Sequence, residues 1–161
     1  MDAKPLNIVA IANYFLLLAD NAGRKLTNKK LQKILYYAQA WNLALKGAPL
    51  FKEPIEAWIH GPAIPAIYRR YKKYGFGVIQ EKGADAVPSE HKDILDEVWR
   101  VYGKFDAEYL ELLTHSEEPW ILARHGLDVD EHSNMLITHE SMQAFYSSLW
   151  QKIQAENASS E

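Results

Sequence analysis

Histidine is the residue type in this sequence best suited to chemistry, because a neutral imidazole binds metals and transfers protons near neutral pH. Six are present: His60, His91, His115, His125, His132 and His139. No pair has the spacing of the H-E-x-x-H helix found in zinc hydrolases. The densest group of possible ligands is Asp128-Val129-Asp130-Glu131-His132, which predicts either a metal-binding loop or a solvated acidic loop.

Motifs for covalent catalysis and phosphate binding are missing from the sequence. It contains no cysteine, no G-x-S-x-G elbow and no Walker loop, and Gly75-Phe76-Gly77 lacks the third glycine of a dinucleotide-binding turn. The pair Glu117-Glu118 is predicted to occupy the first turn of a helix, where the helix dipole favours carboxylates. We therefore expect no catalytic residues, no cofactor and no enzymatic activity. A small metal-dependent hydrolase built on His115 and the 128–132 loop is the alternative.

Charge is nearly balanced over the chain but uneven along it. With 18 Lys and Arg against 21 Asp and Glu, the net charge of -3 gives no overall attraction to nucleic acid or anionic membranes. Two stretches are basic, and one is acidic: Arg24, Lys25, Lys29, Lys30 and Lys33; Arg69, Arg70, Lys72 and Lys73; and Asp106, Glu108, Glu111, Glu117 and Glu118. These stretches indicate either solvated helix faces or a polarised surface that orients a protein partner or RNA. A nucleic-acid-binding regulator is the second alternative, although nucleic acid is not the expected partner.

The elements that would position these residues are mostly helices. Apolar spacing, capping residues and glycines predict helices over about 6–21, 27–46, 64–74, 89–102, 106–113, 116–125 and 138–154. Alternation from Ile55 to His60 predicts a strand, which Phe76–Gln80 could join as a hairpin. The expected fold is mainly α (α+β), a compact bundle of about six or seven helices with a small β-hairpin. Residues 1–155 form one domain in this prediction, and 156–161 a disordered tail.

The apolar stretch from Ile8 to Ala19 is predicted to be a core helix. Asn13 interrupts it, no small-residue cleavage pattern follows, and it is shorter than the roughly 20 residues needed to cross a bilayer. We expect no membrane association, and the lack of cysteine fits a cytoplasmic location.

Aromatic residues on the second predicted helix indicate a binding surface. Tyr36 and Tyr37 point about 100° apart on a helix, so they should not both face one core wall. An exposed tyrosine among lysines has the composition of an interface hot spot. The predicted contact residues are Lys30, Gln32, Lys33, Tyr37 and Arg69, and the predicted core aromatics are Tyr36, Trp41, Trp58, Trp99 and Trp120.

Three blocks, in order along the chain, resemble the Panacea domain family, also described as SocA-like or phage-associated proteins. The first is Leu26-Thr27-Asn28-Lys29-Lys30-Leu31-Gln32-Lys33-Ile34-Leu35-Tyr36-Tyr37-Ala38-Gln39-Ala40-Trp41. The second runs from Pro54-Ile55-Glu56-Ala57-Trp58 through His60-Gly61-Pro62-Ala63-Ile64-Pro65 to Tyr68-Arg69-Arg70-Tyr71. The third is Thr114-His115-Ser116-Glu117-Glu118-Pro119-Trp120 with Ala123-Arg124. His60 stands where an aromatic residue is common in the family.

The resemblance implies a type II antitoxin, which binds and blocks a co-encoded protein toxin. It also implies an alternative, because one family member is an adaptor that hands its toxin to the ClpXP protease. No catalytic residues come with the resemblance. The candidate family positions are Thr27, Gly61, Pro62, Pro65, Thr114, His115, Pro119, Trp120 and Arg124.

Overall fold

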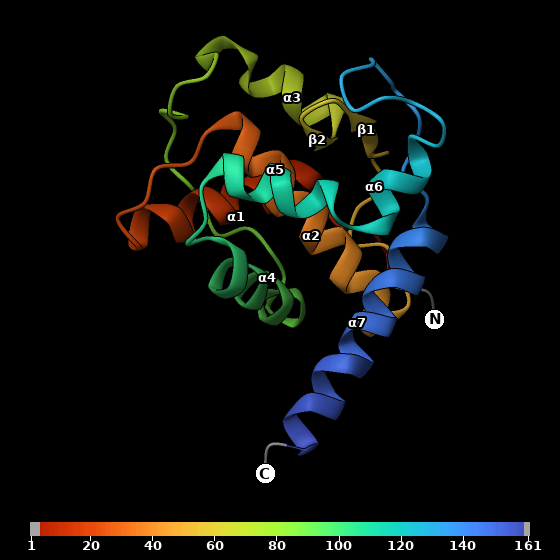
Figure 1. The fold of residues 1–161 in the computed structure, drawn as a ribbon. Helices are drawn as coiled ribbons and strands as arrows, with labels where there is room; N and C mark the ends of the chain where they lie inside the picture. Colours follow the sequence, from red (N-terminus) through yellow and green to blue (C-terminus); the bar gives the residue numbers. More distant parts are fainter. Residues whose placement is uncertain (1–3, 160–161) are drawn as a thin grey trace.

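Helices build most of this protein, and one short hairpin interrupts them (Figure 1). The computed structural model describes residues 4–159, whose elements are α1 (Ile8–Asn21), α2 (Asn28–Lys46), β1 (Glu56–Trp58), β2 (Gly61–Ala63), α3 (Pro65–Tyr71), the 3-10 helix η1 (Lys72–Tyr74), α4 (Ser89–Tyr102), α5 (Ala107–His115), α6 (Glu118–Ala123) and α7 (His139–Ser159). Within these residues, seven α-helices and a two-stranded hairpin confirm the predicted mainly α fold.

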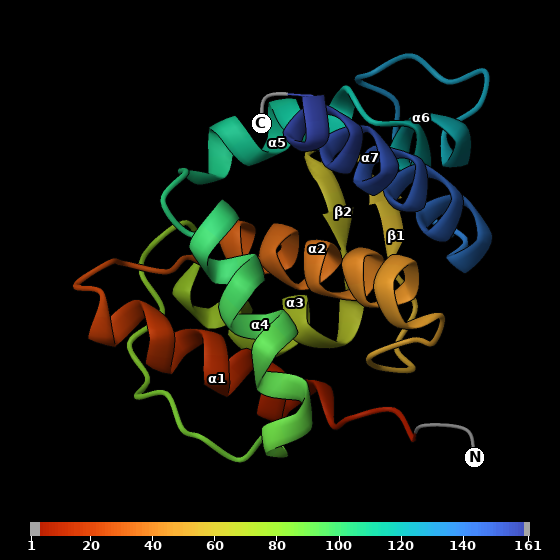
Figure 2. The same ribbon diagram turned by 90° about the horizontal axis from the view of Figure 1, so that it is seen from below.

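The helix α2 crosses the middle of the fold, as Figure 2 shows. It packs against α1, α3, α4, α5, α7 and β2, and every residue from Lys30 to Ala40 is buried. Tyr36 and Tyr37 are both fully buried because neighbours surround the helix on all its faces. The prediction that one of these two rings faces solvent is therefore wrong.

Local capping signals placed the ends of α2 correctly. The Thr27 hydroxyl oxygen accepts a hydrogen bond from the Lys30 amide at 3.2 Å, and Gly47 ends the helix with a φ of 72°. For α1 the predicted start at Leu6 is two residues early. The Asn7 side chain accepts from the Val9 amide at 2.8 Å and so fixes the first turn at Ile8.

The hairpin forms between different segments from those predicted. Strand β1 pairs antiparallel with β2, which follows it directly, and Glu56 lies opposite Ala63. The predicted pairing with Phe76–Gln80 is wrong, because a two-residue turn at Ile59 and His60 closes the hairpin with far less loss of chain entropy. The segment 76–80 instead runs beside the start of α2, where the Ile79 amide donates to the Leu26 carbonyl at 2.9 Å.

The last helix, α7, packs on α2 by its first half and then leaves the body of the protein (Figure 1). Met142 and Tyr146 are its buried residues. The helix continues through Ser159, four residues into the predicted tail, and residues 160–161 lie outside the described residues. None of the helices in the described part of the chain is long and apolar enough to cross a membrane.

Two of the five predicted core aromatics are fully part of the core. Tyr36 and Trp120 are buried. Trp41 and Trp99 are partly buried against the core, and Trp58 is partly exposed beside the Tyr68 ring, with ring centres 5.0 Å apart.

Candidate partner-binding cleft

Most of the predicted partner-contact residues are buried, which corrects their assignment to an outward surface. The exposed fraction is 6% for Lys30, 2% for both Gln32 and Lys33, and 0% for Tyr37. Only Arg69, on α3, is exposed. The physical reason is that other elements cover α2 from Lys30 to Ala40, so the buried polar groups of this stretch are satisfied by distant segments of the chain.

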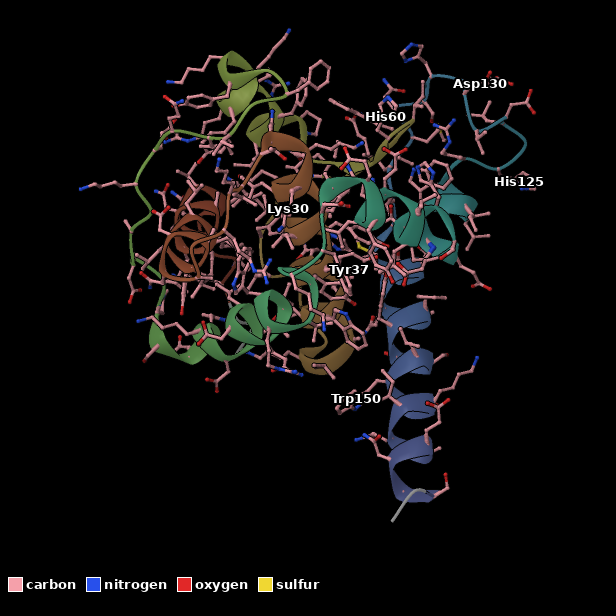
Figure 3. All side chains as sticks on the ribbon, turned by 60° about the vertical axis from the view of Figure 1, so that its left-hand side comes forward. Lys30, Tyr37, His60, His125, Asp130 and Trp150 are labelled. Carbon is pink, nitrogen blue, oxygen red and sulfur yellow. The ribbon has the colours of Figure 1, made fainter. Side chains whose placement is uncertain are left out.

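A cleft of about 1340 Å³ lies over the N-terminal end of α2. The hairpin, α3 with η1, and the start of α5 form its walls. Lys30, Gln32 and Lys33 line this cleft, whereas Tyr37 and Arg69 do not. Figure 3 labels Lys30 on α2 and His60 on the hairpin turn, which both belong to the lining.

The two buried lysines of the cleft are each held by a backbone carbonyl. The Lys30 ammonium donates to the Gly103 carbonyl at 2.6 Å and lies over the Trp99 ring. The Lys33 ammonium donates to the Pro62 carbonyl at 3.2 Å. Burial, together with the charge of Lys29, lowers the pKa of the Lys33 amine to about 7, against an opposing effect of Glu111. Lys33 thus lines the cleft with an amine that burial makes less prone to carry its charge.

The basic and acidic stretches meet at one edge of the cleft instead of forming separate surfaces. The Lys29 ammonium lies 2.7 Å from one oxygen of Glu111 and 3.8 Å from one of Glu108. His60 Nδ1 lies 3.3 Å from the same Glu111 oxygen. The other basic stretch, on α3 and η1, remains exposed.

Amide side chains fasten α2 to the hairpin and α3. The Gln32 carbonyl oxygen accepts from the Ile64 amide at 2.7 Å, and its amide group donates to Asn28 at 2.9 Å. The Asn28 amide group donates to the Tyr68 carbonyl at 3.1 Å. The cleft floor is therefore preformed, because its polar groups are already fixed by internal hydrogen bonds.

Comparison of the sequence with known proteins identifies the family of this chain. The family described as "Antitoxin SocA-like, Panacea domain" matches residues 31–121. The chain belongs to this antitoxin family. A curated relative, Antitoxin SocA of Caulobacter vibrioides (strain NA1000 / CB15N), is 30% identical over 139 residues, which cover 78% of this chain and 74% of the relative. No solved structure matches the chain significantly.

Trp120 and Arg124, from the third sequence block, hold the hairpin in place. The Trp120 indole donates to the Trp58 carbonyl at 2.8 Å, and the Arg124 guanidinium donates to the Ala57 carbonyl at 3.0 Å. The His115 ring stacks on Trp120 with centres 3.9 Å apart. Thr27, Pro65 and Pro119 stand at the first turns or caps of α2, α3 and α6. Trp120 and Arg124 thus fix the hairpin that forms one wall of the cleft, and Thr27 lines the cleft itself.

Gly61 occupies a crowded position where any side chain would collide with Lys33 and Thr114, and a substitution tests this. Its φ is 104°, and a Cβ there would lie 2.6 Å from Lys33 Cε and 3.0 Å from the Thr114 hydroxyl. We expect Gly61→Ala to lower the free energy of unfolding by about 3 kcal/mol, through backbone strain and this collision. Gly126→Ala is the matched control, because Gly126 also has a positive φ but a Cβ there would meet no atom of the described residues within 4 Å, and the substitution should cost only about 1 kcal/mol. Urea unfolding measures both values, and equal losses would contradict the assigned collision.

Glu117 departs most from its predicted environment. Although it precedes α6 as expected, its side chain is buried, and one carboxylate oxygen accepts from the Tyr37 hydroxyl at 2.6 Å and from Tyr146 at 3.0 Å. Tyr37 also stacks on Tyr102 with centres 3.8 Å apart. Burial raises the pKa of the Glu117 carboxyl, against the lowering effect of both tyrosine bonds. The helix-start pattern at 116–119 gave no signal for this inward orientation.

The acidic loop at 128–132, the alternative metal site, does not gather metal ligands among the described residues. Among residues 4–159, no group of three or more His, Cys, Asp or Glu side chains is placed to hold a metal ion. Arg124 donates to the backbone carbonyls of Asp128 and Glu131, so the loop is fastened by its main chain. Figure 3 shows Asp130 on this loop and His125 just after α6, both away from Lys30 and Tyr37.

Proposed function

We propose that this chain is the antitoxin of a type II toxin–antitoxin system and neutralises a co-encoded protein toxin by direct binding in the cytoplasm. The observation that carries the proposal is membership of the antitoxin family, with a curated relative named Antitoxin SocA. The preformed cleft over α2 supports it, because a rigid concave surface binds a partner without a large loss of conformational entropy.

Co-expression with the product of the adjacent gene tests this function. The neighbour alone should stop growth, and the two together should restore it. The tagged chain should also retain the neighbour through affinity purification. A neighbour that is harmless alone, or that stays lethal beside this chain, would refute the proposal.

Delivery of the toxin to ClpXP is the competing mechanism for the same family. The two mechanisms differ in what happens to the toxin, because a blocking antitoxin leaves it intact and an adaptor shortens its half-life. Measuring the half-life of the toxin with and without this chain separates them. An unchanged half-life would remove the adaptor mechanism.

A further inference from the structure

The cleft concentrates positive charge in a chain that is acidic as a whole. Seven Lys and Arg residues line it against three acidic residues, while the net charge of the chain is -3. Positive charge on a concave wall attracts and orients a negatively charged partner. The partner segment that fits this wall is therefore acidic.

Several of these cations have no internal counter-charge. Arg24, Lys25 and Lys72 are exposed, and within residues 4–159 none of them forms an ion pair. Lys30 and Lys33 each donate to one carbonyl, although an ammonium carries three donors. The cationic groups open to a partner therefore lie at the mouth of the cleft, whereas the two floor lysines are almost fully buried.

An unpartnered aromatic ring belongs to the same lining. Phe76, just after η1, is 99% exposed, and Trp58 and Tyr68 line the cleft as well. Aromatic residues are enriched in protein–protein interfaces, so the Phe76 ring gives this wall an apolar surface that a partner can cover. The partner segment should therefore present an apolar side chain next to its acidic ones.

We propose that the cleft binds an acidic, aromatic- or aliphatic-containing peptide segment of the toxin. This inference rests on the proposed function and names the surface and the chemistry of the partner. The volume of about 1340 Å³ exceeds the roughly 300–1,000 Å³ of most small-molecule pockets, which favours a stretch of polypeptide. Glu56, Asp106 and Glu108 also line the cleft and would repel the continuous phosphates of RNA, whereas a peptide can place backbone amides or a basic residue against them.

Lys33 gives the complex a measurable proton signature. Its burial disfavours the charged amine, and a carboxylate brought near it would favour that charge again. Binding near pH 8 should therefore take up a proton. Calorimetric titration of wild-type chain with the purified product of the adjacent gene, in two buffers of different ionisation enthalpy, counts that proton. Lys33→Met should abolish the uptake.

Charge reversal in the cleft tests the proposal directly. We expect K25E/K72E/K104E to raise the Kd for the adjacent gene product by about 30-fold or more. K4E/K52E/K152E is the matched control, because it changes the net charge equally at exposed sites outside the cleft lining, and it should shift Kd by less than about 3-fold.

Phe76→Ser should weaken binding about 10-fold, whereas Leu122→Ser, at an exposed position of α6, should not. Thermal unfolding confirms that each variant is folded.

The possible outcomes separate this inference from the proposed function. If wild-type chain does not bind the gene product at all, the proposed function itself fails. If wild type binds, and the cleft variant binds as tightly as its control, the cleft is not the docking site and the inference is overturned. It is equally overturned if the cleft variant loses copurifying RNA but keeps its affinity for the protein.

Discussion

Replacing Glu117 with alanine is expected to lower the free energy of unfolding by about 3 kcal/mol, because it leaves two tyrosine hydroxyls buried without their acceptor. Tyr37 and Tyr146 both donate to the same Glu117 oxygen, and these residues join α2 and α7 to the start of α6. Glu117→Gln keeps a carbonyl acceptor of the same shape and should cost only about 1 kcal/mol. Urea unfolding at neutral pH compares the two variants.

The pH dependence of the Glu117 variants gives an independent check on the same cluster. In the unfolded chain the pKa of this carboxyl is about 4.3, and in the folded chain its pKa is higher. Between these two values the folded state binds more protons, so this group makes the wild type less stable as pH rises through that window. Glu117→Gln removes the contribution. The free energies of unfolding of wild type and Glu117→Gln should therefore differ in their pH dependence from about pH 4 upward. Parallel curves would contradict the burial of Glu117 in this cluster.

Replacing Lys33 with methionine should change how stability depends on alkaline pH. In the folded chain burial lowers the pKa of Lys33 to about 7, whereas the unfolded value is about 10.4. Between those values the unfolded state binds the extra proton, so wild-type stability gains about 1.4 kcal/mol per pH unit from this group. Below pH 7 both states bind this proton, so the group no longer makes stability depend on pH. The Lys33→Met protein lacks this slope.

Denaturant unfolding of wild type and Lys33→Met at several pH values from about 7 to 9.5 measures the difference directly. Lys52→Met, at an exposed position, controls for loss of a lysine and should follow the wild-type curve. A constant difference between wild type and Lys33→Met over this range would show that Lys33 titrates normally.

Local signals in the sequence predicted what local physics determines. Thr27 and Gly47 marked the ends of α2 because a cap hydroxyl and a left-handed glycine act within one turn. The strand at 55–60 was recognisable from its alternation, but its partner was not. A two-residue turn competes well with a distant segment, and the choice depends on loop entropy that periodicity does not report.

The environment of the polar residues on α2 could not be read from their types. Lys30 and Lys33 look like an exposed basic face, yet they are satisfied by carbonyls 73 and 29 residues further along the chain. Tyr37 is buried for the same reason, since its acceptor Glu117 is 80 residues away. Such partners arise only when the helices pack, so residue types alone predicted an outward orientation that the structure contradicts.

The central claim of the proposed function is that this chain blocks its toxin by binding it rather than by having it degraded. The most direct measurement follows growth and the abundance of the tagged adjacent gene product together in cells that lack ClpXP. The account predicts restored growth while the toxin remains at the same level. Growth that is no longer restored in those cells would contradict it.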